Sequence, residues 1–571
     1  MAVQFDHDTV IEKVKKAGKS GKLFYIPNQE EGQALIEKFL FILELGHPLL
    51  SRPPVEVLAD IVFEPSKVTK TGWVLMFNSI LSTSITAGDS LSRSLKAKLR
   101  WNIWMALDNA SLFLDPCEVS IQALIVLGAH CEDFSTPNLS WILTGHACRL
   151  AQAIELHQDH ADEDGQRRLF LFWSLFIIDK SVSLAFGRPP ILSAQFYEHV
   201  PLPDPEYLAR YAPHVNGRFQ QNTKAHITTK QSNFGGLFVL RNILLAKLTG
   251  NIITYLRPNR KYTCLDQNYM VRDTERRYLK EQVTTWYNET HSVLSNAMAH
   301  EVSREDMDTE QELNLGLDSM KFQYHHLLVL ITRSDENDQN FCLSSTREAL
   351  AMLDRLVSTS ERVYNGIVWQ LLYHPFTPFF VLFGNIVRDP LAESTTEDLN
   401  LLRSTVAYFS RMDSCGNTVG KLEKIARVFS SLAEASIQHA ARNARLARAG
   451  ESTASTLGMS STGARQSLDQ AFASDYPSSS LLPPTSYNMN EIPFSSDEMD
   501  SDVLLGWLSS PDSTLPFSAS AQHGGEVQEQ EHDLYSKSSI RSASQIKGRK
   551  RSLDCTFDWF SWDLYNDNNT M

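Results

Sequence analysis

The sequence predicts an all-α protein, made of one large helical domain and a disordered acidic C-terminal tail. Apolar residues recur at helical spacings of three and four along most of the first 446 residues, and neither alternating strands nor a repeat of fixed period is evident. After Ala447 small and polar residues dominate, a composition that cannot bury enough apolar surface to offset the entropy of ordering. We therefore expect a basic lead-in over residues 1–31, a helical domain over 32–446 and a disordered tail over 447–571.

Several helices are predicted from spacing alone. A helix over 34–43 is separated by Pro53 and Pro54 from an amphipathic helix over 95–114. Further along the chain, helical periodicity covers 237–256, 272–294, 327–331, 350–387 and 399–446.

Two helices between these segments have predicted starting points. Asp115 as N-cap, Pro116 at the first helical position and Glu118 as the reciprocal acid of a capping box predict a helix that runs through Val126. Thr136–Pro137 starts the next helix in the same way. Its apolar stripe consists of Ala147, Leu150, Ala151 and Ile154, and its small residues Gly145, Ala147 and Ala151 are expected to let a neighbouring helix approach closely.

The most informative helix begins with the basic pair Arg167 and Arg168. It contains Trp173 and Asp179 and is apolar on almost every side, so it must be buried. Gly187 occupies the position after the helix, where a left-handed residue commonly ends it. The turn continues as Arg188, Pro189 and Pro190.

This stretch resembles the regulatory middle domain of fungal zinc-cluster transcription factors. The hallmark of that domain is a basic pair, an aromatic-rich helix that contains Asp, and a Gly-Arg-Pro turn. The upstream residues that match are Ser120–Leu124, Pro137, Trp141, Gly145, Ala147, Arg149, Ala151, Leu156 and His157, and Pro201–Pro203 match downstream. The resemblance is specific over 115–203, and Lys180 departs from it where an arginine is common.

The resemblance implies a nuclear transcription regulator rather than an enzyme. Such regulators control sets of metabolic genes, including secondary-metabolite biosynthetic clusters. The implied partners are transcriptional coactivators, promoter DNA reached directly or through a partner regulator, and a small-molecule effector, with a homodimer as a further expectation. The alternative is a coregulator or scaffold that does not bind DNA and acts through a partner transcription factor.

The family binds DNA through a cluster of six cysteines that holds two zinc ions. This sequence contains no Cys-x-x-Cys pair, so no cofactor is expected in this chain. Zinc is expected only if a cysteine cluster is missing from the N-terminus. Both alternatives, a regulator without the module and an upstream exon that encodes it, stay open.

Length, composition and charge restrict the class of protein further. With 571 residues and 42% hydrophobic content, the chain can bury more than a single core usually holds. The first ten residues contain no apolar run, and Asp179–Lys180 or Pro375 and Pro378 interrupt the longest apolar segments, short of the about 20 residues that cross a membrane. The 7 cysteines show no disulfide framework. We therefore expect a soluble protein without a membrane partner.

The charge is concentrated in the tail. The net charge is −14, and the residues from Glu451 onward hold seven basic and seventeen acidic side chains, which contribute −10. Nucleic-acid affinity comes chiefly from neutralising phosphates, so any DNA contact of this acidic chain is expected to be local.

Asp179 is the charged residue that most needs an explanation, because an unpaired charge inside an apolar helix is costly. We predict that it forms an ion pair with Arg188 or with Arg149. The alternative is an acid that senses an effector in a pocket.

No catalytic or metal-binding residues are assigned. His157 and His160 could share a helix face, but the acids that follow them are better explained as charges at a helix start. Gly18-Lys19-Ser20 lacks the rest of a phosphate-binding loop, and Asp335–Asp338 lacks the last acid of a magnesium-binding motif.

The tail contains three candidate segments. Acids surround Leu504, Trp507 and Leu508, which would share a helix face in an activation segment. A second candidate contains Trp559, Phe560 and Trp562, with docking on the helical domain as the alternative. The basic residues Lys547, Arg549, Lys550 and Arg551, like the lysines over 13–22, are candidates for nuclear import.

Overall fold

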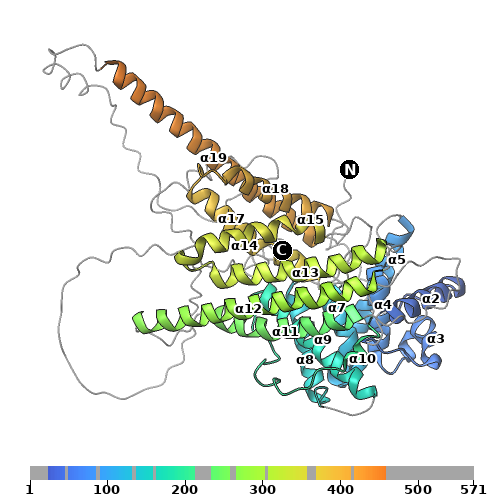
Figure 1. Ribbon diagram of the computed structural model, residues 1–571. Coiled ribbons are helices and arrows are strands. Elements are labelled where there is room, and N and C mark those ends of the chain that lie inside the picture. Colours follow the sequence, from blue (N-terminus) through green and yellow to red (C-terminus); the bar gives the residue numbers. More distant parts are fainter. Residues whose placement is uncertain are drawn as a thin grey trace, which may run out of the picture. The chain divides into compact units, whose positions relative to one another are not determined.

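The computed structural model describes ten stretches of the chain. They are residues 23–45, 49–84, 90–130, 137–158, 163–211, 233–256, 265–302, 307–356, 368–412 and 417–457. All regular elements in these stretches are helices, so the all-α prediction is confirmed there (Figure 1). The lead-in lysines, the predicted activation segments and the predicted import signal lie outside the described residues.

The helices follow one another along the chain as listed here. They are α2 (Gln29–Leu45), α3 (Val55–Phe63), the 3-10 helix η1 (Pro65–Lys67), α4 (Thr71–Ser84), α5 (Ser90–Leu107), α6 (Ser111–Leu114), α7 (Glu118–His130), α8 (Pro137–Ala153), α9 (Glu163–Ala185), α10 (Pro205–Leu208), α11 (Asn233–Leu256), α12 (Leu265–Glu301), α13 (Met307–Thr332), η2 (Glu336–Asp338), α14 (Gln339–Ala351), α15 (Leu353–Leu356), α16 (Val368–Tyr373), α17 (Phe376–Arg388), α18 (Thr395–Arg411) and α19 (Asn417–Leu457). Within the described ranges the chain forms two compact units, residues 23–384 with 400–427 and residues 385–399 with 428–457.

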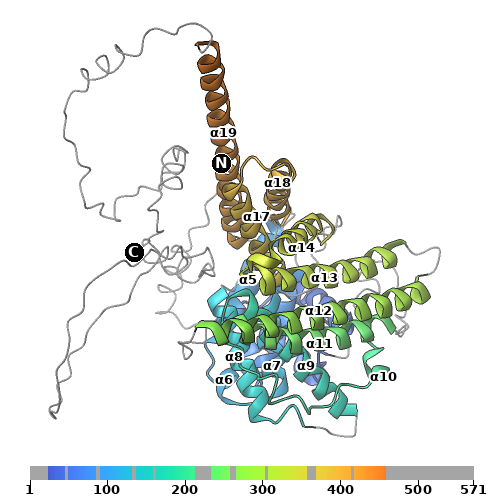
Figure 2. The ribbon, with the colours of Figure 1, turned by 60° about the vertical axis from the view of Figure 1, so that its left-hand side comes forward.

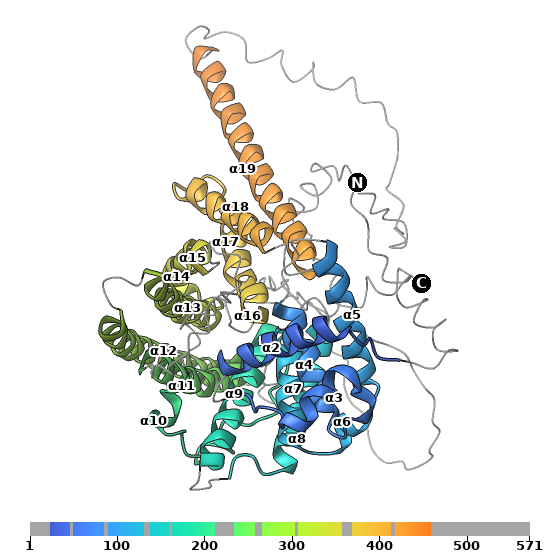
Figure 3. The ribbon, with the colours of Figure 1, turned by 90° about the vertical axis from the view of Figure 1, so that its right-hand side faces the viewer.

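In the larger unit, α4 is the centre of an N-terminal group of helices. It packs against α5 and α7, and α7 packs against α8 (Figure 3). Every residue from Thr71 to Ser82 is buried, and a Cβ atom on Gly72 would lie 2.9 Å from the backbone nitrogen of Ser120, so only glycine allows α4 this close to α7. Helix α4 was not predicted from the sequence, because a helix buried on all sides shows no amphipathic period.

A second group of the same unit consists of α11, α12, α13 and α14, each packed against the next (Figures 1 and 2). Side chains from α11, α12 and α13 form one apolar core that includes Phe234, Trp286 and Ile331. Tyr287 of α12 stacks on Tyr324 of α13 with ring centroids 4.2 Å apart. Each helix of this group is therefore packed mainly against its neighbours in sequence.

Helix α9 lies between the two groups and contacts α7, α8, α11 and α16. Four of its aromatic side chains are at most 2% exposed, those of Phe170, Phe172, Trp173 and Phe176. This confirms that the helix is buried. Gly187 has φ +64°, and its amide and that of Arg188 donate to the carbonyls of Leu184 and Ser183 at 3.4 and 2.8 Å. This is the Schellman ending that glycine favours, as predicted.

Helix α11 is long and apolar enough to cross a membrane by length and composition, which corrects the expectation that charges or prolines interrupt all of the longest apolar segments. Half of the apolar stretch is buried inside the structure, and the core helix of a soluble protein passes the same test. Arg241 of this helix pairs with Glu289 of α12 at 3.1 Å, and Lys247 lies over the ring of Trp173 at 4.7 Å. Both basic groups therefore have protein partners within the helical unit.

Several predicted helix boundaries were wrong. The helix predicted over 95–114 is broken after Leu107, because Asn109 donates to the Thr71 hydroxyl at 2.7 Å and accepts from the Ser111 amide at 3.0 Å, which starts α6. The segment 350–387 contains the separate helices α16 and α17. Helix α19 continues to Leu457, past the boundary predicted at 446.

The packing of α8 agrees only in part with its prediction. Ala147, Leu150 and Ala151 are buried, as their stripe indicated. Gly145 does not create a close approach, because a Cβ atom there would meet only Ile191, at 4.0 Å. The glycine that faces α8 is Gly128 of α7, where a Cβ atom would lie 3.4 Å from the Thr144 hydroxyl and 3.5 Å from the Ser140 carbonyl oxygen.

Candidate functional site

The basic pair at the start of α9 binds one carboxylate of α7. Arg167 binds one carboxylate oxygen of Glu118, and Arg168 binds the other at 2.9 Å. Arg168 also donates to the Ile154 carbonyl at 2.9 Å. Arg167 reaches the Ser51 hydroxyl at 3.1 Å. Glu118 was predicted to close a capping box, and this was wrong because two guanidinium groups occupy its oxygens. The pair therefore joins α9 to α7, to the end of α8 and to the segment before α3.

The aromatic side chains of α9 are positioned by an indole hydrogen bond and by contacts between rings. The indole of Trp173 donates to the Pro201 carbonyl at 2.8 Å, which joins α9 to the segment before α10. The ring of Phe172 packs edge-on against Trp173 and Tyr197, with centroids 5.3 and 5.1 Å apart. Buried indole N–H groups need such a partner, so this contact positions the Pro201–Pro203 segment.

Asp179 pairs with the next residue, Lys180, and not with Arg188 or Arg149 as predicted. The two charged groups are 2.7 Å apart, and their side chains are 2% and 1% exposed. The carboxylate also accepts from the amides of Ile191 and Leu192 at 2.9 and 3.0 Å, and the Lys180 ammonium donates to the Leu192 carbonyl. Burial lowers the pKa of Lys180, and the adjacent Asp179 carboxylate opposes that shift.

The Gly187–Pro190 turn makes this arrangement possible. It reverses the chain after α9, so that the amides of Ile191 and Leu192 return to Asp179. Arg188 lies over the ring of Trp141 at 5.4 Å instead of facing the carboxylate. Pro189 and Pro190 are mainly at the surface. The hallmark residues thus form two groups, the basic pair at the start of α9 and the network of Asp179 and Lys180 that closes its end.

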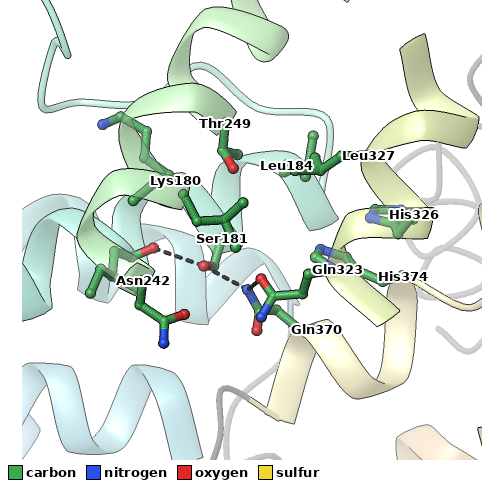
Figure 4. A pocket seen from close by; sticks show the side chains of 13 residues that line it. Lys180, Ser181, Leu184, Asn242, Thr249, Gln323, His326, Leu327, Gln370 and His374 are labelled. Atoms are coloured by element: carbon green, nitrogen blue, oxygen red, sulfur yellow. Dashed lines mark hydrogen bonds between the residues drawn. The ribbon is translucent and has the colours of Figure 1, made fainter. Parts of the chain in front are cut away.

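A small polar cavity lies beside this network, lined by α9, α11, α13 and α16 (Figure 4). Gln370 donates to the Ser181 hydroxyl at 2.8 Å and to the Gln323 oxygen at 3.3 Å, and Ser181 donates to the Ile177 carbonyl at 2.8 Å. The volume open to the centre of a water molecule is about 10 Å³, which suits roughly one water. This site was not predicted from the sequence, because its residues in α11, α13 and α16 lie far along the chain from the hallmark helix and belong to no motif.

Two stacked histidines complete the wall of the cavity. The rings of His326 and His374 are 4.2 Å apart and nearly parallel, and their side chains are buried. Both ring nitrogens of His374 and Nδ1 of His326 lack a hydrogen-bond partner among the described residues. Burial lowers the pKa of His374 to about 3, and burial, His374 and Arg333 hold the pKa of His326 well below its usual value. Both rings are therefore neutral at physiological pH.

This pair makes stability depend on acidity. A histidine whose pKa is lowered by folding takes up a proton first in the unfolded chain, so its contribution is complete above about pH 6.5 and is lost as the pH falls toward 3. The unfolding free energy of the unsubstituted chain should therefore fall between pH 7 and pH 5. In His374→Phe this fall should be smaller by about 2 kcal/mol. Urea unfolding at both pH values measures this, with the exposed His300→Phe as control; equal losses in all three proteins would contradict it.

Other candidate sites from the sequence have structural roles where they are described. His157 packs against the rings of Phe172 and Tyr197, while His160 lies outside the described residues. Asp335 and Asp338 bind Arg276 of α12, and Asp338 also binds Lys280 at 3.0 Å. No group of three or more His, Cys, Asp or Glu side chains in the described stretches could hold a metal ion.

Residues 73–299 match the family model described as the fungal specific transcription factor domain. The chain therefore contains this regulatory domain of fungal transcription factors, over a wider range than the specific match at 115–203. The matched region extends from α4 to α12 and contains all the hallmark residues.

Individual relatives agree with this class. The chain is 24% identical over 426 residues to a transcriptional regulator of Claviceps purpurea, covering 72% of this chain and 65% of the relative. It is 25% identical over 393 residues to an uncharacterized transcriptional regulatory protein of Schizosaccharomyces pombe, covering 65% and 59%. An ABC-transporter-regulating transcription factor of Aspergillus oryzae is 20% identical over 460 residues, covering 72% and 48%. The chain thus spans less than two thirds of these relatives, and no solved structure matches it.

These relatives are named for the regulation of transcription.

Proposed function

We propose that this chain is a nuclear transcription regulator of metabolic genes, with a secondary-metabolite biosynthetic cluster as the target class. The match of residues 73–299 to the fungal specific transcription factor domain carries this proposal. The name of the Aspergillus oryzae relative, an ABC-transporter-regulating transcription factor, supports the regulation of transcription. A nuclear location follows from the work of such a regulator at promoters.

The geometry of the hallmark network supports a regulatory role for the helical domain. Arg167, Arg168 and Asp179 have protein partners at both ends of α9, so their side chains hold helices together. The adjacent cavity is too small for a metabolite as it stands. A small-molecule effector would therefore act by separating α9, α13 and α16, which the Gln370 contacts connect.

The acidic tail is the proposed activation region, in which coactivators bind two aromatic segments. Acidic residues around Leu504, Trp507 and Leu508 keep the apolar side chains solvated until a partner groove accepts them. Trp559, Phe560 and Trp562 form the second segment. Lys547, Arg549, Lys550 and Arg551 are the proposed import signal.

A reporter assay tests the activation claim. The full chain is fused to an unrelated DNA-binding domain and compared with the same fusion ending at residue 450. We expect the full chain to activate, the shortened chain to be silent, and alanine at Leu504, Trp507 and Leu508 to remove most of the activity. Alanine at Leu481 and Leu482, apolar tail residues without nearby acids, is the matched control. A silent full-length fusion, at a protein level equal to that of an active standard, would refute activation.

A second candidate function is a coregulator that reaches promoters only through another transcription factor. The absence of any Cys-x-x-Cys pair from this sequence favours it. It predicts that the purified chain contains no zinc and selects no DNA sequence from a random pool. Recovery of a defined sequence motif by the chain alone would exclude this alternative.

A further inference from the structure

The second half of α19 has an unusual composition for this acidic protein. Buried residues follow the first half of the helix as a stripe, and none of its described residues after Ala433 is buried. The helix nevertheless continues to Leu457. No Asp or Glu occurs between Glu434 and Glu451, whereas Arg442, Arg445 and Arg448 all lie in this interval and are exposed. Its many alanines favour a helix without a buried face, which leaves the arginines of this half exposed.

These three arginines differ from the neighbouring arginines Arg411 and Arg427 in having no acidic partner among the described residues. Arg427, earlier on the same helix, pairs with Glu423, and Arg411 of α18 pairs with Asp354. Arg442, Arg445 and Arg448 form no ion pair in the part of the chain that the structure describes. Three guanidinium groups at successive turns, without an acidic partner among the described side chains, can bind an anionic partner, since the planar group binds phosphate and carboxylate oxygens in pairs.

The spacing of the arginines suits an extended polyanion. Successive arginines are three residues apart, so each is about 4.5 Å further along the helix axis and about 60° further around it. Gln438, His439 and Asn443 are also exposed in this interval and add hydrogen-bonding groups. The alanines at 440, 441 and 444 have small side chains, so a partner can approach the helix backbone closely.

We propose that residues 438–448 of α19 form a docking surface for the phosphate backbone of double-stranded DNA. The inference rests on the proposed function, which places the chain at promoters. Contacts to phosphates fix the position of a protein on a duplex without selecting its sequence. The surface would therefore hold the chain on DNA chosen by another module or another protein.

The acidic tail of the same chain is the main competitor, because its carboxylates could also bind arginine. An activation segment with Leu504 and Trp507 needs an apolar groove as well as positive charge. Leu446 is the one large hydrophobic residue exposed in the described stretch after Ala433. The surface thus offers charge and hydrogen bonds with almost no apolar area, which fits a phosphate backbone better.

Fluorescence anisotropy of the full chain on a labelled 24-base-pair duplex tests this docking surface. The triple variant Arg442→Gln/Arg445→Gln/Arg448→Gln is compared with Lys421→Gln/Lys424→Gln, which removes two exposed charges from the first half of the same helix. Three phosphate contacts predict a slope of log K against log salt that is about 2.7 shallower in the triple variant. Between 50 and 200 mM salt, the affinity of the unsubstituted chain should therefore fall by a factor about 40 times larger than that of the triple variant. The lysine variant should follow the unsubstituted chain.

Three outcomes would overturn the proposal: equal slopes for all three proteins, tighter binding of the unsubstituted chain to an RNA hairpin than to the duplex, or tighter binding to a peptide of residues 491–512. Circular dichroism of the triple variant checks that the helix is retained. The reporter fusion described above reaches DNA through a foreign domain, so its result does not depend on this surface. The two claims can therefore fail separately.

Discussion

Replacing Asp179 with Ala is expected to lower the unfolding free energy by about 3–5 kcal/mol. The substitution leaves the Lys180 ammonium buried without its partner, and it also leaves the amides of Ile191 and Leu192 without an acceptor. Removing one member of a buried pair costs more than the pair itself contributes, because the remaining charge has lost both water and its counterion. Urea unfolding at pH 7, followed by circular dichroism, measures the loss.

The cost should depend on Lys180, and a double-mutant cycle shows this. Asp179→Ala/Lys180→Met removes both charges, so its loss should be smaller than the sum of the two single losses. The matched control is Asp354→Ala, which breaks the exposed pair with Arg411 and should cost at most about 1 kcal/mol. Strict additivity in the cycle, or an unchanged unfolding curve for Asp179→Ala, would show that the pair does not stabilise the domain. An unchanged curve with a lost effector response would instead favour the sensing role.

Replacing Trp173 with Ala should lower the unfolding free energy by about 3–5 kcal/mol. The side chain is 0% exposed and packs against Phe172 and Phe176, so its removal leaves a large cavity in the centre of the unit. The Pro201 carbonyl also loses its donor. Thermal unfolding followed by circular dichroism measures the effect.

Two variants separate packing from the hydrogen bond. Trp173→Phe keeps an aromatic ring but removes the indole N–H, and it should cost clearly less than alanine. Trp104 is 51% exposed, and Trp104→Ala should change stability by no more than about 1 kcal/mol. A similar loss at Trp104 and Trp173 would mean that burial is not the cause.

Part of the site could be predicted from the sequence because it depends on local rules. Gly187 was recognised as the helix end from its position before two prolines, and the structure gives it the expected positive φ. Burial of Trp173 followed from an apolar helix without a polar face. The need for a partner for Asp179 was predicted correctly, but the partner was wrong. Lys180 is adjacent in sequence, and only the returning segment after Pro190 encloses the pair and completes its hydrogen bonds.

Contacts between distant segments could not be predicted in the same way. Glu118 has a suitable position for a capping box, yet Arg167 and Arg168 bind it from a helix about 50 residues further on. The stacking of His326 on His374 depends on the fold in the same sense. A local pattern cannot show which of several partners a charged or aromatic side chain will meet.

The amino-acid order alone is sufficient for the helical class, the burial of α9 and the ending of that helix at Gly187, because helix periodicity and glycine conformation act over a few residues. The residues that would recruit other molecules in the tail were also proposed from composition, and they stay proposals. Folding in three dimensions settled the ion pairs of α9, the break at Asn109 and the polar cavity beside Gln370. Each of these features joins side chains that only helix packing brings within hydrogen-bonding distance. No single segment of the sequence can therefore indicate them.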